Sequence, residues 1–500
     1  MAMTDPEAGM KEEDLFDDDG TMRSDSGDEA TKSSLDSNIV IFDSINDPLD
    51  PRNWPTHKKV TTTVLYGFTT AGATWASSVY SPATASIAQE FGVSAEVSTL
   101  GLTLFLFGFG IGPLLWAPCS EVYGRRLAVF IPYFISALFC FGVATGKDIQ
   151  TVLICRFFLG FFSSAPVTNT GGVMRDLWTD AQRGAAILCY SMAVIGGPMF
   201  SPIAGAAIVH SYLGWRWTHY LTGIIMLAVL AIDVVLIDET YQKVVLVNKA
   251  KKLRKETGNW ALHAKHEEDI NFQDLVEKFL VKPFQLLRTP ICFSMVLYAS
   301  FVYGIVYLIF SAYDIEFAQV RGWSPVVASL PFIAIFVGCI CGAVICYYNQ
   351  GFYMRHLKAN NGKSVPEARL PTMMIGGISL SAGLFIFAWT SNPKINPVAE
   401  IIASILLGMG FFGIFQGVTN YLVDTFGEFG ASAVAANSLM RNVFAGSFPL
   451  FTTQMFNKLG VDWAVSLLGF VSVSMIPIPF FFYYFGKRIR AKGVLSCESP

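Results

Sequence analysis

Long apolar runs separated by short polar loops dominate the chain after residue 59. A bilayer core about 30 Å thick is crossed by about 20 apolar residues of helix, and runs of that length predict twelve transmembrane spans here. A hydrophilic stretch over residues 238–288 separates the first six spans from the last six. The predicted spans cover residues 60–81, 99–118, 127–145, 151–172, 184–208, 216–237, 289–312, 326–348, 370–390, 398–421, 431–455 and 462–485.

This pattern predicts an all-α integral membrane protein with twelve transmembrane helices in two six-helix halves. Composition supports the prediction, because 53% of the residues are hydrophobic, 15% are charged and the mean hydropathy is +0.47. That balance leaves too little polar surface to cover soluble domains. The expected regions are an acidic tail over 1–52, a first half over 53–237, a central loop over 238–288, a second half over 289–485 and a second tail over 486–500.

The placement of Lys and Arg predicts how these helices are oriented. Loops rich in Lys and Arg stay on the cytoplasmic side of a membrane. If both termini are cytoplasmic, the segments on that side hold 25 Lys and Arg, and the loops on the other side hold five. We therefore expect a multi-pass protein with an even number of spans and both termini in the cytosol.

The first 50 residues are set apart by charge, with 15 Asp and Glu against three Lys and Arg. An acidic, Ser-rich segment with few aromatic residues buries too little surface to offset the entropy of ordering. We expect a disordered cytoplasmic tail. A tail regulated by phosphorylation is the alternative.

The loop after the second span carries a recognisable pattern. Residues 112–126 read GPLLWAPCSEVYGRR and include Glu121, Gly124, Arg125 and Arg126. The pattern resembles motif A of the major facilitator superfamily, with Glu121 where that motif has Asp. This variant is similar to the fungal drug:proton antiporter family with twelve spans, of the polyamine, multidrug and secondary-metabolite exporter type.

The resemblance implies a charge clamp at the cytoplasmic end of the second span. Glu121 would pair with Arg183 at the start of the fifth span or with the N-terminus of a neighbouring helix, and Gly124 would permit a tight turn. Asp176, in the RDLW segment, resembles the loop between spans 4 and 5 of the same family. We assign these residues, with the Arg pair after Gly124, to proton coupling and gating.

Spans 4 and 5 resemble two further motifs of this family. Arg156 in span 4 lies among apolar residues and resembles motif B. Because a charge at membrane depth costs about 2.5–3.5 kcal/mol, Arg156 should face the bundle interior, either in proton coupling or as a structural anchor. Span 5 resembles motif C, the antiporter signature, with a general seam for helix packing as the alternative. The residues that carry this second resemblance are Gly196, Gly197, Pro198, Pro202 and Gly205.

Polar and aromatic side chains within the spans are candidates for a substrate cavity. Asn437 and Arg441 lie four residues apart and so share one face of span 11. Amphipathic side chains suit a cavity that accepts flat, partly apolar molecules, and simple packing is the alternative. The cavity candidates are Asn169, Tyr303, Tyr307, Gln416, Asn420, Asn437 and Arg441.

The resemblance implies a proton-coupled antiporter that exports toxins, fungal secondary metabolites or drugs across the plasma membrane. An interior with Arg156 and Arg441 and few acids favours neutral or anionic molecules. The embedded acids Asp233, Asp314 and Glu400 are either helix-end charges or proton carriers. An organic-acid or polyamine exporter of the same fold is one alternative, and a transporter-like solute receptor is another.

We expect a protein that is not an enzyme, because the sequence has no GxSxG or HExxH pattern, and the lack of a Walker A pattern excludes ATP-driven export by this chain alone. We expect no cofactor, since the proton gradient supplies the energy, and no metal site. The expected partners are a small-molecule substrate, protons and the lipid bilayer. We expect a monomer that does not bind nucleic acid.

Overall fold

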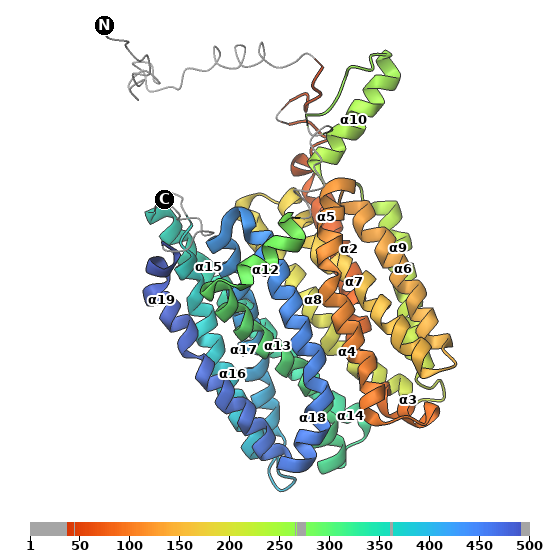
Figure 1. The fold of residues 1–500 in the computed structure, drawn as a ribbon, viewed down its shortest axis with the longest axis vertical. Helices are drawn as coiled ribbons and strands as arrows, with labels where there is room; N and C mark the ends of the chain where they lie inside the picture. Colours follow the sequence, from red (N-terminus) through yellow and green to blue (C-terminus); the bar gives the residue numbers. More distant parts are fainter. Residues whose placement is uncertain (1–37, 45, 266, 268–276, 361–363, 492–500) are drawn as a thin grey trace. The chain divides into compact units, whose positions relative to one another are not determined.

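The computed structural model describes residues 38–44, 46–265, 267, 277–360 and 364–491, and these are mostly helical (Figure 1). The first half contains α2 (Thr56–Ser78), α3 (Thr84–Phe91), α4 (Ala95–Ile111), α5 (Pro113–Tyr123), α6 (Arg125–Thr145), α7 (Ile149–Leu177), α8 (Asp180–Val209) and α9 (Arg216–Leu236). The second half contains α13 (Pro290–Tyr313), α14 (Pro325–Ser329), α15 (Pro331–Ala359), α16 (Leu370–Thr390), α17 (Val398–Phe426), α18 (Gly430–Met475) and α19 (Pro477–Arg490).

Shorter elements complete the chain. Between the halves in sequence lie α10 (Gln242–Thr257), the π-helical turn η4 (Glu277–Val281) and α12 (Lys282–Leu287). A second π-helical turn, η5 (Asp314–Val320), continues α13. The remaining short helices are η2 (Pro51–Asn53), η3 (Ser81–Ala83), η6 (Pro366–Arg369) and η7 (Gly427–Phe429).

The helices confirm the predicted fold class. Among the described residues, nine helices are long and apolar enough to cross a membrane, or ten if α4 and α5, bent by 40°, form one span. The Thr-rich α2, which covers the first predicted span, is not among them. The element from Gly430 to Arg490 covers two predicted spans, because Gly460 has a φ of 75° that ends one helix, and the chain reverses there (Figure 1).

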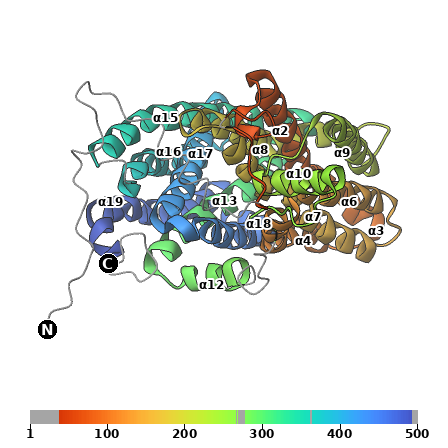
Figure 2. The same cartoon turned by 90° about the horizontal axis from the view of Figure 1, so that it is seen from above.

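The crossings form two groups that lie side by side (Figure 2). In the first group α4 and α6 pack on α7, and α2 packs on α8; in the second, α15 and α16 pack on α17, and α13 packs on α18. Across the boundary, α4 contacts α18 and α8 contacts α15. The second and fifth crossings of one half therefore meet the fifth and second of the other. We call the side where α2 begins and α19 ends the terminal side, and the opposite side the distal side.

Glycines bring two helix pairs into backbone contact. A Cβ on Gly160 of α7 would lie 2.0 Å from the carbonyl oxygen of Phe105 on α4. In the second half, a Cβ on Gly408 of α17 would lie 2.0 Å from the carbonyl oxygen of Ile335 on α15. No side chain fits at either distance, so small residues set the spacing of equivalent helices in both halves.

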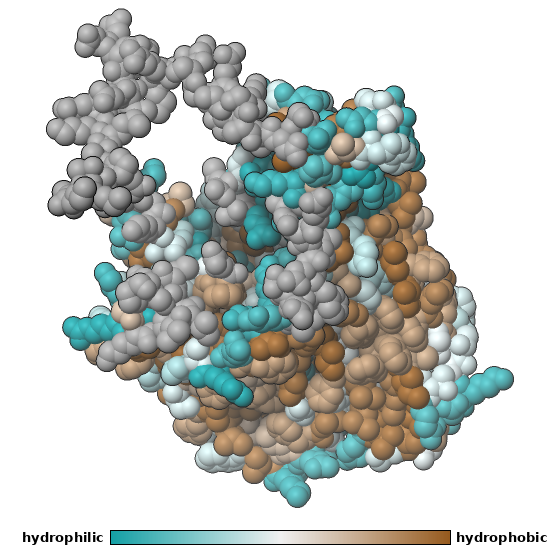
Figure 3. Space-filling model, turned by 45° about the horizontal axis from the view of Figure 1, so that its top comes forward, coloured by the Kyte–Doolittle hydropathy of each residue, from teal (hydrophilic) through white to brown (hydrophobic). Residues whose placement is uncertain are grey.

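The surface fits an apolar solvent. On the face seen in Figure 3, hydrophobic residues cover the side of the bundle, and hydrophilic residues gather mostly toward its ends. Large exposed side chains such as Phe68, Ile131, Val235 and Phe470 are 61%, 54%, 80% and 59% exposed. Such residues would be a liability in water, but they match lipid tails.

A small unit separate from the bundle joins residues 38–47 to part of the central segment. The Val40 amide donates to the His263 carbonyl at 2.8 Å, and Lys249 pairs with Asp43 at 2.7 Å. This part of the acidic tail therefore makes specific contacts, which differs from the predicted disorder, because a cation of the central segment offsets its charge. The tail before residue 38 lies outside the described residues.

Candidate functional site

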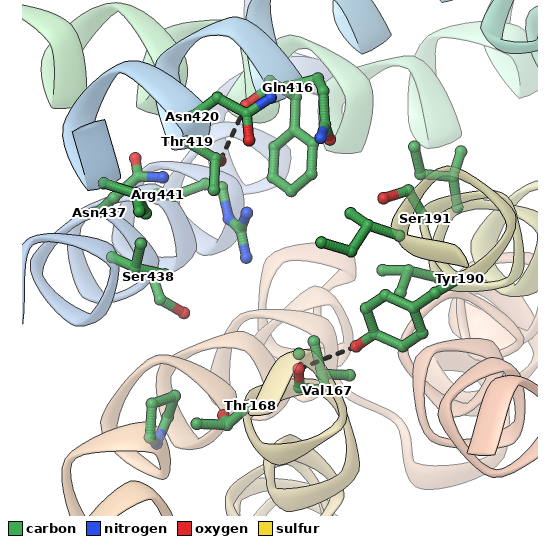
Figure 4. Close-up of a pocket in the computed structure, with 18 of the residues that line it drawn as sticks. Val167, Thr168, Tyr190, Ser191, Gln416, Thr419, Asn420, Asn437, Ser438 and Arg441 are labelled. Atoms are coloured by element: carbon green, nitrogen blue, oxygen red, sulfur yellow. Dashed lines mark hydrogen bonds between the residues drawn. The ribbon is translucent and has the colours of Figure 1, made fainter. Parts of the chain in front are cut away.

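A cavity of about 750 Å³ lies between the two halves. Its lining comes mainly from α5, α7 and α8 of the first half and from α13, α15, α17 and α18 of the second, and Figure 4 shows part of it. All the predicted cavity candidates line it: Asn169, Tyr303, Tyr307, Gln416, Asn420, Asn437 and Arg441. The structure thus brings them to one place, and their part in binding stays a prediction.

Contacts between the halves close the distal side of this cavity. The Thr103 hydroxyl of α4 donates to the Gly446 carbonyl of α18 at 2.8 Å. Deeper in the bundle, the Tyr307 hydroxyl donates to Ser77 Oγ at 3.1 Å. In the other direction the lining continues to Glu121 and other residues at the terminal ends of the helices. The cavity therefore runs from the middle of the bundle toward the terminal side.

Arg156 of α7 is fully buried and is held by backbone carbonyls. Its Nε donates to the Gly101 carbonyl at 3.0 Å, its Nη1 to that of Ala76 at 2.7 Å and its Nη2 to that of Ser77 at 3.1 Å. The guanidinium also lies 4.5 Å from the Tyr80 ring centroid. No carboxylate among the described residues pairs with it, and its role in proton coupling stays a prediction. Its contacts fit the structural-anchor alternative, because they join α7 to α2 and α4.

The segment that resembles motif A is built around Glu239. One oxygen of Glu239 accepts from the Arg125 amide at 3.0 Å, and the other accepts from the Arg126 amide at 3.1 Å. The carboxylate therefore caps the N-terminus of α6, where the helix dipole favours negative charge. Gly124 has a φ of 90°, and a Cβ there would lie 2.5 Å from Glu239 Oε2, so glycine fits both the turn and the carboxylate.

Arg125 joins this cap to α7. Its Nε pairs with Asp176 Oδ2 at 3.0 Å, and its Nη1 donates to Ser120 Oγ at 2.8 Å. Its guanidinium lies 4.6 Å from the Tyr241 ring centroid, and burial raises the pKa of that Tyr hydroxyl, which stays neutral. Two residues assigned to gating, Arg125 and Asp176, thus form one ion pair.

Glu121 contacts a partner other than the predicted one. Both of its carboxylate oxygens accept from Lys278 Nζ at 3.0 Å. Lys278 lies in η4, where its carbonyl accepts from Ser432 Oγ of α18 at 2.7 Å. Glu121 therefore has a partner that the sequence did not predict, and its pair with Arg183 stays a prediction, because the Arg183 side chain lies outside the described residues. The link to Lys278 connects α5 of the first half with α18 of the second on the terminal side.

The segment that resembles motif C packs α8 against α2. A Cβ on Gly197 would lie 2.3 Å from Thr74 Oγ1 and 2.6 Å from the Ala71 carbonyl oxygen. The Pro198 carbonyl, free of its usual helical partner because Pro202 lacks an amide hydrogen, accepts from Ser78 Oγ at 3.0 Å. Gly205 also faces this seam. The contacts agree with the helix-packing alternative for these residues.

Two neighbouring glycines test this packing role. We expect Gly197→Ala to destabilise the protein by about 1–3 kcal/mol, because a methyl group has no room against α2. Gly196→Ala should change stability by less than about 1 kcal/mol, since its Cβ would lie 3.4 Å from the nearest Phe336 ring atom. Thermal unfolding of the purified variants in detergent measures both. Equal effects of the two substitutions would contradict the packing explanation.

A buried charge cluster on the distal side was not identifiable from local sequence. Arg321 Nε pairs with Glu316 at 3.1 Å, and its Nη2 pairs with Glu400 at 2.7 Å. Both carboxylates are fully buried, and each has one oxygen without a partner among the described residues. With both carboxylates ionised, the cluster has a net charge of −1, which a single proton on either carboxyl group neutralises. Glu316 lies beyond the predicted seventh span, and the π-helical turn η5 carries it inward.

The other embedded acids differ from this cluster. Asp233 of α9 is fully buried; its Oδ2 accepts from Thr69 Oγ1 at 2.5 Å, and its Oδ1 has no partner in the described part of the chain. No ion pair joins Asp233 to any described cation. Asp314 accepts from Gln319 at 3.4 Å in an exposed position, which fits a helix-end charge.

The sequence and the fold are similar to known proteins. The profile of the Major Facilitator Superfamily matches residues 66–450. "Efflux pump bik6" of Gibberella fujikuroi is 48% identical over 460 residues, which cover 92% of this chain and 95% of the relative. "Citrinin biosynthesis cluster MFS transporter mrr1" of Monascus ruber is 42% identical over 470 residues, which cover 93% of each chain.

A solved structure agrees at the level of the fold. The proton:xylose symporter XylE matches with a TM-score of 0.60, covering 86% of this chain and 96% of the symporter. The sequence identity is 16%, so this likeness shows a shared arrangement of helices and nothing of the substrate.

Proposed function

The chain belongs to the major facilitator superfamily, and on that premise we propose that this transporter exports small amphipathic organic molecules, such as toxins or secondary metabolites, in exchange for protons. The observation that carries the proposal is the cavity of about 750 Å³ between the halves, which is large enough for a molecule of drug size. The similar proteins include an efflux pump and a transporter of a citrinin biosynthesis cluster, which also supports the proposal.

The mechanism follows from the position of the cavity. A site between two halves becomes accessible to each side in turn when the halves rock against each other. In the state seen here the distal contacts, such as Thr103 with Gly446, are closed, and the cavity reaches the terminal side. A substrate enters from the terminal side, and opening of the distal contacts releases it on the other.

We place the terminal side in the cytosol. The segments on the terminal side hold 25 Lys and Arg, and those on the distal side hold five, which favours an orientation with both termini in the cytosol. We propose that the transporter is a monomer. Export across the plasma membrane then moves the substrate from the cytosol to the exterior.

Proton coupling requires a group whose proton affinity changes between the two states. Asp233 suits this role, because it is buried without a counter-cation and one of its oxygens is unpartnered. Protons entering down their gradient would supply the energy, so that no cofactor is needed. Arg156 is a weaker candidate, since carbonyl groups already satisfy its donors.

Inside-out vesicles that contain the protein test export and coupling together. We expect uptake of Nile red, a neutral amphipathic dye, or of the anion 2-naphthoate to depend on an acidic vesicle interior and to stop when a protonophore is added. Uptake that continues without the gradient would contradict coupling. Binding without any net uptake would contradict export and support the solute-receptor alternative.

The link between Glu121 and Lys278 provides a test of rocking. We expect Glu121→Gln and Lys278→Met each to lower turnover about 2- to 5-fold with little change in KM, because a link made in one state shifts the balance between states. The double variant should be no worse than either single variant. Glu277→Gln is the matched control, since Glu277 pairs with Lys282 nearby without joining the halves. A large rise in KM at unchanged turnover would place Glu121 in substrate binding instead.

A further inference from the structure

Arg441 of α18 has a guanidinium that no protein group neutralises. The side chain is 8% exposed, and its Nε is buried without a hydrogen-bond partner. Throughout the described ranges, no ion pair or hydrogen bond involves this guanidinium. Its neighbours are two aromatic faces, with the Tyr303 ring centroid at 4.5 Å and that of Phe415 at 4.9 Å.

Other buried arginines of the bundle are satisfied. Arg156 donates to three carbonyls, Arg125 pairs with Asp176, and Arg321 pairs with two carboxylates. A guanidinium has five donors and keeps its charge at any physiological pH. A buried charge without a partner is costly, so the unused donors of Arg441 favour binding of an anionic group in the cavity.

The direction of the side chain supports this conclusion. In Figure 4 the guanidinium points from α18 into the open cavity, toward the α8 residues Tyr190 and Ser191 and the α7 residue Thr168. Asn437, one turn earlier on α18, is 2% exposed and also has an oxygen without a partner. Asn437 and Arg441 thus line the same cavity from one helix, and each has a buried polar atom without a partner.

The acids that line the cavity do not compensate Arg441. Glu121 pairs with Lys278, and Asp424 pairs with Arg369 at 2.8 Å. Both pairs lie toward the terminal ends of the helices and cancel locally. The middle of the cavity is therefore positively charged, which repels polyamines and attracts anions.

We propose that Arg441 binds the carboxylate of a flat aromatic acid and that Tyr303 and Phe415 flank it with aromatic surface. The planar fork of arginine matches a carboxylate with two parallel hydrogen bonds, and the neighbouring rings suit stacking of the ligand's own ring. The proposal rests on the proposed export function and narrows its substrates to aromatic carboxylates.

Binding of three molecules of one shape to the purified protein tests the charge preference. The probes are 2-naphthoate, neutral 2-naphthamide and cationic 2-naphthylmethylammonium, measured by titration calorimetry in detergent. We expect 2-naphthoate to bind at least about 10-fold more tightly than 2-naphthamide, and the cation most weakly, because charge-assisted hydrogen bonds are the stronger ones. Equal affinities for the three probes, or no binding of 2-naphthoate, would overturn the proposal.

Variants of Arg441 test whether this residue causes the preference for the anionic probe. Arg441→Gln should weaken 2-naphthoate about 10- to 100-fold and change 2-naphthamide less than about 3-fold. Arg355→Gln is the control, because Arg355 is exposed on α15 and is not part of the cavity lining, and it should change the affinity for 2-naphthoate less than about 3-fold. Full affinity of Arg441→Gln for 2-naphthoate would exclude Arg441 as the anion site.

Two further measurements keep the result interpretable. Arg441→Lys keeps the charge and so serves if Arg441→Gln does not fold; it should lose part of the affinity, because an ammonium cannot form the paired hydrogen bonds. Unchanged 2-naphthoate affinity in Arg441→Lys would contradict the geometric part of the proposal. Binding is measured without a proton gradient, so a failure of export or coupling in vesicles is distinguishable from a failure of this site.

Discussion

Replacing Arg156 with Lys is expected to destabilise the protein by about 2–4 kcal/mol. The guanidinium satisfies carbonyls of Gly101, Ala76 and Ser77, which belong to two different helices. An ammonium is a compact point charge that cannot reach these acceptors in the same geometry. At least one buried carbonyl then loses its hydrogen-bond partner.

Thermal unfolding in detergent and the amount of protein at the cell surface measure this effect. Arg355→Lys is the control, because Arg355 is exposed on α15, and it should behave as the unmodified protein. A stable Arg156→Lys variant that reaches the membrane but no longer exports against a gradient would contradict the anchor role. That result would return Arg156 to proton coupling.

Replacing Arg321 with Met should destabilise the second half by about 3–5 kcal/mol. The change leaves the carboxylates of Glu316 and Glu400 fully buried and without a cation. It also removes the donors that Arg321 gives to the carbonyls of Ile395 and Thr390, both at 3.0 Å. Breaking a buried ion pair from one side is costly because the remaining charge has no solvent.

Combining Arg321→Met with neutral substitutions of its two partners separates the effect of the unpaired charges on stability from the effect of lost packing. We expect Glu316→Gln and Glu400→Gln together to restore much of the stability lost in Arg321→Met, since no unpaired charge remains. Lys394→Met, an exposed cation of a distal loop, should change stability by less than about 0.5 kcal/mol. Thermal unfolding of this set measures the difference. If the triple variant is as unstable as Arg321→Met alone, the loss comes from packing and not from charge.

Several residues that line the cavity could be predicted from the sequence, because polar side chains are rare within membrane spans. A membrane span consists mostly of apolar residues, so Asn169, Gln416, Asn437 and Arg441 stand out against it. All four line the cavity between the halves. Their partners could not be predicted in the same way, because a partner can be any residue that the fold brings near.

Each unpredicted partner depends on helix placement. Glu121 meets Lys278, which is 157 residues away, and Arg321 meets Glu400, which is 79 residues away. Arg156 binds backbone carbonyls. Because every residue has a carbonyl, these partners could not be identified from residue types. Glu316 lies beyond the apolar run of the seventh span, and only the π-helical turn places it inside.

The sequence by itself determined the fold class, the number of crossings and the division into two halves, because the thickness of a bilayer sets the length of each apolar run. It also determined which glycines are present, but only the tertiary structure showed that Gly160, Gly197 and Gly408 hold helix pairs at backbone contact. The tertiary structure alone decided which buried charges are neutralised. The reason is physical: the energy of a buried charge depends on the few groups within a few ångströms of it, and packing of distant segments chooses those groups.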